Sequence, residues 1–150
     1  MEELVRIDRI GSQLIASDWK EAIIRAGELL VKSGDIEYAY IENMINSVIE
    51  MGPYIVLTKG FALAHYAPCD AVKNTAISLI NLKDPVNFGS GNDPVRVVMC
   101  LACVDKQSHI EYLQKLATKL MEKGMIDKLS ECKTDEELYQ TINSSGKEVA

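Results

Sequence analysis

The chain has 150 residues, 47% of them hydrophobic, and a formal net charge of −6 at pH 7. This length predicts one domain, residues 1–150, that can bury its own core. The absence of a basic cluster excludes nucleic acid as the favoured partner, because nucleic-acid binding rests on Lys and Arg that neutralise phosphates. A basic protein partner remains compatible with the charge. Apolar runs are too short to span a membrane and the acidic start differs from a signal peptide, so we expect a cytoplasmic protein.

Residues 1–15 are weakly patterned, and we expect a loosely structured end with a short strand over residues 10–16. Asp18 and Glu21 have the spacing of a capping box, which predicts a helix that Gly34 ends. A second helix is expected over residues 36–50 and stops at Gly52-Pro53. Its predicted apolar face holds Tyr40, Ile41, Met44, Ile45, Val48 and Ile49.

The middle of the chain has the patterns of β-strands. The expected strands cover residues 54–57, 61–63, 74–82 and 95–104, with a turn at residues 83–85 and a short edge segment at residues 86–88. The continuous apolar run 95–104 predicts a central strand that is buried on both faces.

The last third predicts helices again. Ser108 and Glu111 suggest a capped helix that Gly124 ends, and Thr134 suggests a final helix through about Ile142. The first of these helices is expected to bury Ile110, Leu113, Leu116, Ala117, Leu120 and Met121. A turn is expected over residues 125–129, and residues 144–150 are expected to be loose. The predicted class is α/β, bordering on α+β: a mixed sheet of about five strands flanked by helices in a single domain.

Four cysteines raise the question of a redox or metal site. Cys100 and Cys103 match the C-x-x-C spacing but fall within the predicted central strand. Residues three apart on a strand point to opposite faces, so both sulfurs cannot easily hold one metal. A buried cysteine behaves as a small hydrophobic residue, and we expect no metal site and no cofactor here.

Two histidines are the strongest candidates for chemistry. His65 and His109 each follow a predicted strand, and His109 opens a helix, whose free N–H groups suit an anion. A neutral imidazole nitrogen is abundant near pH 7, so one histidine can act as a nucleophile while the other donates to phosphoryl oxygens. The spacing alone leaves two unrelated structural histidines as an alternative.

The residues around His65 resemble a known family. The stretch 52–68, GPYIVLTKGFALAHYAP, is similar to the signature G-P-Y-I-V-I-x-P-G-x-A-L-P-H-A-R-P of enzyme IIA components of the bacterial phosphotransferase system, in the ascorbate-type branch of the mannitol–fructose superfamily. Other similar pieces are DWKEA at 18–22, YIENM at 40–44, LKDPVNFG at 82–89, NDPV at 92–95 and DKQSH at 105–109.

The resemblance implies a phosphohistidine relay. His65 aligns with the histidine that accepts a phosphoryl group from the histidine phosphocarrier protein and passes it to a cysteine of a IIB component. His109 aligns with the second active-site histidine, which stabilises the phosphoryl group. The family uses no metal or organic cofactor, meets the membrane only through a IIC transporter, and leaves a homodimer open.

This sequence departs from the family at the site itself. Ala64 stands where the family has proline, Ala67 where it has arginine, and Lys59 where it has the proline of the turn. Loss of the arginine removes a bidentate phosphate donor. Lys59 or Lys73 is a candidate replacement charge. Three interpretations therefore stand: a phosphocarrier for ascorbate or a related sugar, a IIA-like regulatory module that senses phosphorylation, and a thiol or metal protein that uses Cys69, Cys100 and Cys103.

Overall fold

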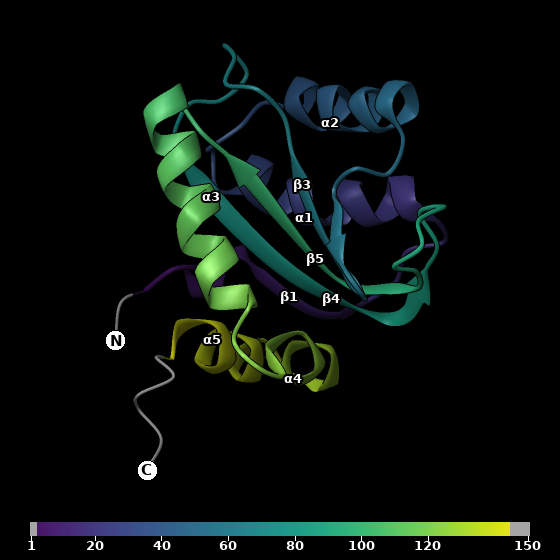
Figure 1. Cartoon of the computed structure of the whole chain (residues 1–150). Helices are drawn as coiled ribbons and strands as arrows, with labels where there is room; N and C mark the ends of the chain where they lie inside the picture. Colours follow the sequence, from purple (N-terminus) through teal and green to yellow (C-terminus); the bar gives the residue numbers. More distant parts are fainter. Residues whose placement is uncertain (1–2, 145–150) are drawn as a thin grey trace.

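A five-stranded sheet lies at the centre of the protein, with helices on both of its faces (Figure 1). The computed structural model describes residues 3–144. In chain order the elements are η1 Ile7–Arg9, β1 Ile10–Leu14, α1 Trp19–Lys32, α2 Tyr38–Met51, β2 Val56–Thr58, β3 Phe61–His65, β4 Ala76–Val86, β5 Val95–Ala102, α3 Lys106–Leu120, α4 Met125–Glu131 and α5 Asp135–Asn143. Among the helices within residues 3–144, none has both the length and the apolar character that a membrane crossing requires.

The sheet is mixed, as predicted. The strand order is β1-β4-β5-β3-β2, in which β1 with β4 and β3 with β5 run parallel while the other two pairs run antiparallel. This architecture confirms the α/β prediction and the expected number of about five strands.

Strand β5 divides the core into two halves. It is the third of the five strands, and its alternating side chains enter different hydrophobic clusters. Val98 and Cys100 face α1 and α2, whereas Val97 and Met99 face the layer of α3, α4 and α5. The prediction of a central strand buried on both faces is therefore confirmed.

The cysteines of the C-x-x-C spacing belong to these two halves of the core. Cys100 packs with its Sγ 3.7 Å from Met44 Sδ in one cluster, and Cys103 lies in the other. Burial raises the pKa of Cys100 to about 12 and that of Cys103 to about 11, so both remain protonated thiols at neutral pH. Within the described residues, no group of three or more His, Cys, Asp or Glu side chains is placed to hold a metal.

The predicted turn at residues 83–85 was wrong, because β4 continues through it to Val86, which pairs with Val95. A register shift between Asn81 and Val86 accommodates this irregular stretch within the strand. The chain instead reverses in the following loop, where the Asp93 carboxylate accepts hydrogen bonds from the backbone N–H groups of Phe88, Gly89 and Ser90.

Helix α3 differs most from its prediction. It begins at Lys106 and is capped by Asp105, whose carboxylate accepts from the Ser108 amide at 2.8 Å, so Ser108 is not the cap. Only Leu116 and Leu120 of the predicted stripe are buried, while Ile110 and Met121 are 55% and 84% exposed. The predicted turn over residues 125–129 is the short helix α4, and Ile49 of α2 is exposed rather than on the buried face.

The two ends of the described chain are joined. The Asn143 side chain accepts hydrogen bonds from the amides of Leu4 and Val5 and donates to the carbonyl of Val5. Residues 4–14 are therefore more ordered than their weak sequence pattern suggested. The Thr134 cap of α5 is confirmed by its bond to the Glu137 amide. The tail beyond residue 144, expected to be loose, lies outside the described residues.

The side chain of Asn81 links strand β4 to the end of helix α4 through hydrogen bonds. Its fully buried side chain accepts from the Gln13 amide at 2.6 Å and donates to the carbonyls of Leu129 and Cys132 at 2.9 and 2.8 Å. All three partners are backbone groups, so the amide side chain must present both an acceptor and two donors.

We predict that Asn81→Asp lowers the free energy of unfolding by about 3–5 kcal/mol at neutral pH, because it removes both donors and turns an oxygen toward two carbonyls. Urea unfolding followed by circular dichroism measures the change. Asn87→Asp makes the same substitution at an exposed position and should change stability by less than about 0.5 kcal/mol. Equal midpoints for the two variants would contradict this account of Asn81.

Candidate functional site

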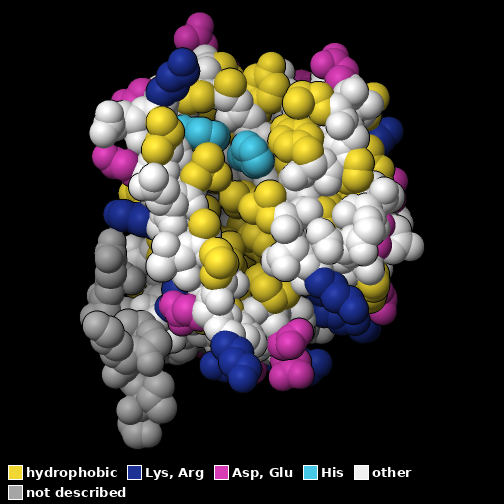
Figure 2. Space-filling model, in the orientation of Figure 1, with side chains coloured by type: hydrophobic (Ala, Val, Ile, Leu, Met, Phe, Trp, Pro, Cys, Tyr) yellow, Lys and Arg dark blue, Asp and Glu magenta, His cyan; other side chains and the backbone are white. Residues whose placement is uncertain are grey.

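The two histidines meet at one end of the sheet, where strands β3 and β5 finish. Strands β3 and β5 are parallel and His65, the last residue of β3, pairs with Leu101 near the end of β5. Helix α3 starts four residues after β5 ends, and His109 lies in its first turn. The imidazole centroids are 5.9 Å apart with a 49° angle between the ring planes. Figure 2 shows both rings side by side on the surface, above a hollow lined by hydrophobic side chains.

The hydrogen bond of His65 fixes its tautomer. Its Nδ1 lies 2.7 Å from the carbonyl oxygen of Leu63. Because a carbonyl can only accept, Nδ1 carries the proton and Nε2 keeps its lone pair. Burial lowers the pKa of His65 below its ordinary value; the Leu63 bond opposes this, and the neighbouring His109 adds to the lowering. The ring is therefore neutral at pH 7, with Nε2 available as a nucleophile.

His109 has the complementary arrangement. Its Nδ1 is buried and has no hydrogen-bond partner within the described residues. A buried N–H without an acceptor is rarer and costlier than a bare acceptor nitrogen, which favours the proton on Nε2. His109 then offers an N–H donor beside the nucleophilic nitrogen of His65. Two rings of opposite tautomer suit a group that is bound through a nitrogen and stabilised through its oxygens.

Tyr54 supports the His65 ring from the other side. The two rings meet edge to face, with centroids 5.6 Å apart and an interplanar angle of 86°. The Tyr54 hydroxyl lies 2.8 Å from the Oγ of Ser47, a buried polar residue of α2. Sequence reasoning did not select Tyr54, although it matches the tyrosine of the signature around His65 and could have been noted there as an aromatic neighbour of the site.

The helix start beside His109 is less open to an anion than expected. The Asp105 carboxylate occupies the Ser108 amide, and this bond lowers the pKa of Asp105. Asp105 therefore carries a negative charge at the position where the sequence suggested free N–H groups. The histidine nitrogens, rather than the N-terminus of α3, are therefore the main candidates for binding an anionic group.

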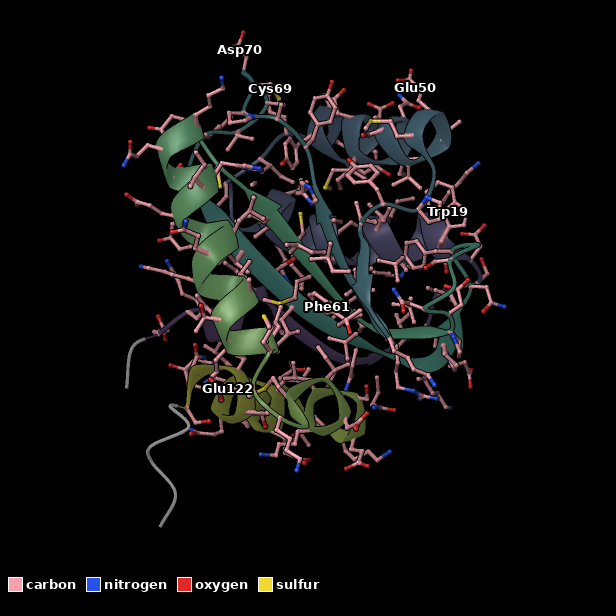
Figure 3. All side chains as sticks on the ribbon, viewed as in Figure 1. Trp19, Glu50, Phe61, Cys69, Asp70 and Glu122 are labelled. Carbon is pink, nitrogen blue, oxygen red and sulfur yellow. The ribbon has the colours of Figure 1, made fainter. Side chains whose placement is uncertain are left out.

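Of the two candidate replacements for the missing arginine, Lys59 lies far from the site and Lys73 is paired with an acidic residue. Lys59 precedes β3, so it stands at the opposite end of that strand from His65, about 20 Å away along an extended chain. Lys73 lies 3.8 Å from Glu37 in an exposed ion pair. Cys69 and Asp70, by contrast, lie in the loop after β3 at the same end of the molecule as the start of α3 (Figure 3).

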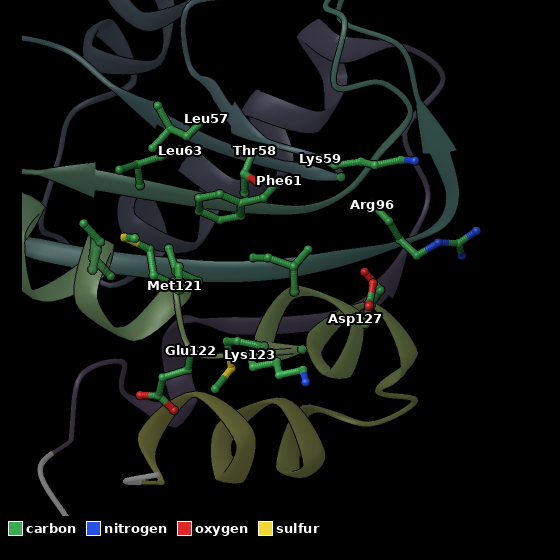
Figure 4. A pocket seen from close by; sticks show the side chains of 18 of the residues that line it. Leu57, Thr58, Lys59, Phe61, Leu63, Arg96, Met121, Glu122, Lys123 and Asp127 are labelled. Carbon is green, nitrogen blue, oxygen red and sulfur yellow. The ribbon is translucent and has the colours of Figure 1, made fainter.

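An apolar groove of about 1010 Å³ lies along β3, and its lining reaches Leu63, two residues before His65. Phe61, Leu63 and His65 are two residues apart on one strand and so share one face of the sheet. The groove lies between this face and the helices α3 and α4, and Figure 4 shows Leu57, Phe61, Leu63 and Met121 around it. Lys59, Arg96, Glu122, Lys123 and Asp127 supply its charged rim. It exists because α3 buries only two of its apolar side chains.

The mixed sheet and the histidine pair at the end of β3 define a candidate phosphoryl carrier. Residues 3–145 match the family described as the phosphoenolpyruvate-dependent sugar phosphotransferase system, EIIA 2, and the chain belongs to this family. It is thus a phosphocarrier component of that phosphotransferase system.

Individual relatives support the assignment along the whole chain. The ascorbate-specific PTS system EIIA component of Escherichia coli K12 is 31% identical over 144 residues, which cover 95% of this chain and 94% of the relative. The mannitol-specific cryptic enzyme IIA of E. coli superposes with a TM-score of 0.85 at 28% identity, covering 94% of this chain and 98% of that one. Enzyme IIA in its complex with phosphorylated enzyme IIB of the E. coli mannitol system gives 0.80 at 25% identity, covering 92% and 96%.

We predict that His65 titrates below the ordinary histidine pKa of about 6.5. Because burial is the largest cause, His109→Gln should raise the pKa of His65 while leaving it below that value. Nuclear magnetic resonance of ¹⁵N-labelled imidazoles measures both titrations. Since the folded pKa lies below the unfolded one, His65 contributes less to stability as the pH falls below about 6.5. A His65 midpoint at or above 6.5 would contradict the prediction.

Proposed function

We propose that this protein is a cytoplasmic phosphocarrier that accepts a phosphoryl group on Nε2 of His65 from the histidine phosphocarrier protein. It passes the group to a cysteine of a IIB component during uptake of ascorbate or a related sugar. The observation that carries the proposal is the pair of facing imidazoles, one with a bare Nε2 and the other with an Nε2–H. The 31% identity to an ascorbate-specific relative supports the choice of substrate.

The hydrogen bonds suggest how the transfer proceeds. The lone pair of His65 Nε2 attacks phosphorus as the nitrogen–phosphorus bond of the donor breaks, and the donor imidazole keeps that electron pair. His65 becomes positively charged, and the Leu63 carbonyl, which accepts from Nδ1–H at 2.7 Å, stabilises that charge. The Nε2–H of His109 donates to a phosphoryl oxygen, a role that matters only once the group has arrived. In the second step a thiolate of the partner attacks phosphorus and His65 Nε2 recovers its lone pair.

The groove beside the histidines is the surface that we assign to both partners. Its lining reaches Leu63, two residues before His65 on β3, and includes Leu57 and Met121, which are 54% and 84% exposed. Two further exposed apolar side chains adjoin the histidines. The Tyr54 ring packs on His65, and Ile110 follows His109 in the chain. An apolar surface next to the reactive nitrogen lets a docked partner exclude water from the transfer.

A regulatory IIA-like module is the second candidate. It is favoured by Ala67, which stands where the family signature has arginine, together with the position of Lys59 at the far end of β3 and the ion pair of Lys73 with Glu37. Such a module would be phosphorylated and bind partners without supporting transport flux. Phosphoryl transfer onward to a IIB component distinguishes the two candidates.

We predict that incubation with phosphoenolpyruvate, enzyme I and the histidine phosphocarrier protein adds one acid-labile phosphoryl group to the chain. His65→Ala should abolish this addition, because it removes the nucleophilic Nε2, whereas the bare Nδ1 of His109 is buried. Intact-mass spectrometry before and after acid treatment provides the measurement. An unchanged mass for the wild type would reject the phosphocarrier proposal.

We predict that His109→Ala slows single-turnover transfer by about 10²–10³, the usual effect of removing one preorganised oxyanion donor. His109→Gln retains an N–H donor and should recover part of the rate. Rapid-quench measurement of transfer to the IIB partner compares variants that are folded to the same extent as the wild type. Wild-type rates in His109→Ala would show that the two histidines do not share a phosphoryl group.

We predict that Leu57→Asp raises KM for the IIB partner about tenfold or more, equivalent to the loss of at least ~1.4 kcal/mol of binding, with little change in thermal stability. Ile15→Asp is the matched control. Ile15 is also exposed, at 65%, but it follows β1 at the opposite edge of the sheet. An equal effect of both substitutions would indicate a general charge effect rather than docking in the groove.

A further inference from the structure

Tyr40 is a buried polar group that the transfer chemistry above leaves unused. Its side chain comes from α2 and is 0% exposed. The hydroxyl lies 2.9 Å from the Tyr66 amide nitrogen, 3.0 Å from the Tyr66 carbonyl oxygen and 2.9 Å from the Leu101 carbonyl oxygen. All three atoms are backbone atoms, and they belong to Leu101 of β5 and to Tyr66, the residue that follows β3.

The position of this hydroxyl follows from the register of β3 and β5. Val97 donates its amide to the carbonyl of Gly60, and the pairing continues in register to His65 opposite Leu101. In a parallel ladder the bonds recur every second residue, so the bond after those of Ala64 would join the Tyr66 N–H to the Leu101 carbonyl. The Tyr40 hydroxyl stands between these two groups, accepting from one and placed to donate to the other. Strand pairing consequently ends at His65.

The inserted hydroxyl remains a donor under all ordinary conditions. Burial, the largest cause, raises the pKa of Tyr40 far above its usual value, so the proton stays on the oxygen. The single proton bonds to a carbonyl of Leu101 or Tyr66 while an oxygen lone pair accepts the Tyr66 N–H. The Tyr66 ring also packs edge to face on the Tyr40 ring, with centroids 6.4 Å apart at 79°. The residue after His65 is therefore held by both its backbone and its side chain.

We propose that Tyr40 is a positioning residue for phosphoryl transfer: its hydroxyl keeps β3 and β5 apart immediately after His65 and thereby sets the orientation of the His65 imidazole toward His109. Without the hydroxyl, the Tyr66 N–H and the Leu101 carbonyl either close into one more ladder bond or remain unpaired. Formation of that ladder bond would draw the backbone next to His65 toward β5. The His65 ring, which is hydrogen-bonded to the Leu63 carbonyl, would move with it. The proposal rests on the proposed function, since it concerns the efficiency of that transfer.

Tyr40→Phe tests the proposal with the smallest change available. We expect single-turnover transfer to the IIB partner to slow by about 10–100-fold, the scale of a misplacement near 1 Å, with KM for the partner unchanged. We also expect the His65 pKa or the balance of its ring tautomers to change in ¹⁵N spectra. The control is Ser78→Ala, which removes another fully buried hydroxyl that joins a helix to the sheet, 2.7 Å from the Ala26 carbonyl. That variant should lose stability but keep the wild-type rate and the wild-type His65 spectrum.

The outcomes separate this proposal from the function on which it rests. A wild-type protein that accepts no phosphoryl group rejects the function. A phosphorylated wild type whose Tyr40→Phe variant transfers at the wild-type rate rejects only the positioning role, as does a rate loss matched by Ser78→Ala. If Tyr40→Phe does not fold, hydrogen exchange in the wild type decides: the Tyr66 amide should exchange as slowly as the ladder amides of β3, and fast, loop-like exchange would overturn the proposal.

Discussion

The parallel pairing of β3 with β5, in the register that sets His65 opposite Leu101, is the constraint on which the site depends. Parallel strands end at the same edge of a sheet, so the residue that closes β3 and the helix that follows β5 must meet there. A slip of one residue would turn His65 from the groove face to the face covered by α1 and α2, because side chains alternate along a strand. The same strand register therefore determines both the packing of the sheet and the geometry of the site.

The two faces of that sheet are used differently. The face under α1 and α2 is closed, and the alternate side chains of β3 and β5 fill it with small and medium apolar groups such as Ala62, Ala64 and Cys100. The other face is only partly covered, since α3 contributes just Leu116 and Leu120 as buried residues. Apolar area left exposed on α3 lowers the stability that the fold would otherwise gain, and it leaves the groove beside His65 open to a partner.

The sequence was sufficient for the features that depend on local pattern. The apolar run of β5, the Asp18 and Thr134 caps and the α/β class follow from periodicity and side-chain chemistry, and the resemblance around His65 selected the family. The failures depend on tertiary contacts. Ile110 and Met121 have core-like spacing but are exposed, and residues 83–85 have turn chemistry but lie in a strand whose register shifts. Tyr40 was predicted only as part of an apolar face, because its hydroxyl partners lie 26 and 61 residues away in the sequence.

The charge distribution around His65 suits a protein that passes a phosphoryl group on rather than one that retains it. A carrier must accept a phosphoryl group from one protein and release it to another, so strong stabilisation of the bound state would favour the first step at the expense of the second. Within the described residues, the groups in contact with the His65 ring are a backbone carbonyl and the rings of Tyr54 and His109, and none of them is a lysine or an arginine. An arginine at position 67 would add charge-assisted bonds to the phosphoryl oxygens. With Ala67 in that position, the phosphohistidine that we propose at His65 would be less stabilised than it would be beside arginine, which would weaken acceptance and favour donation to the next carrier by the same free energy.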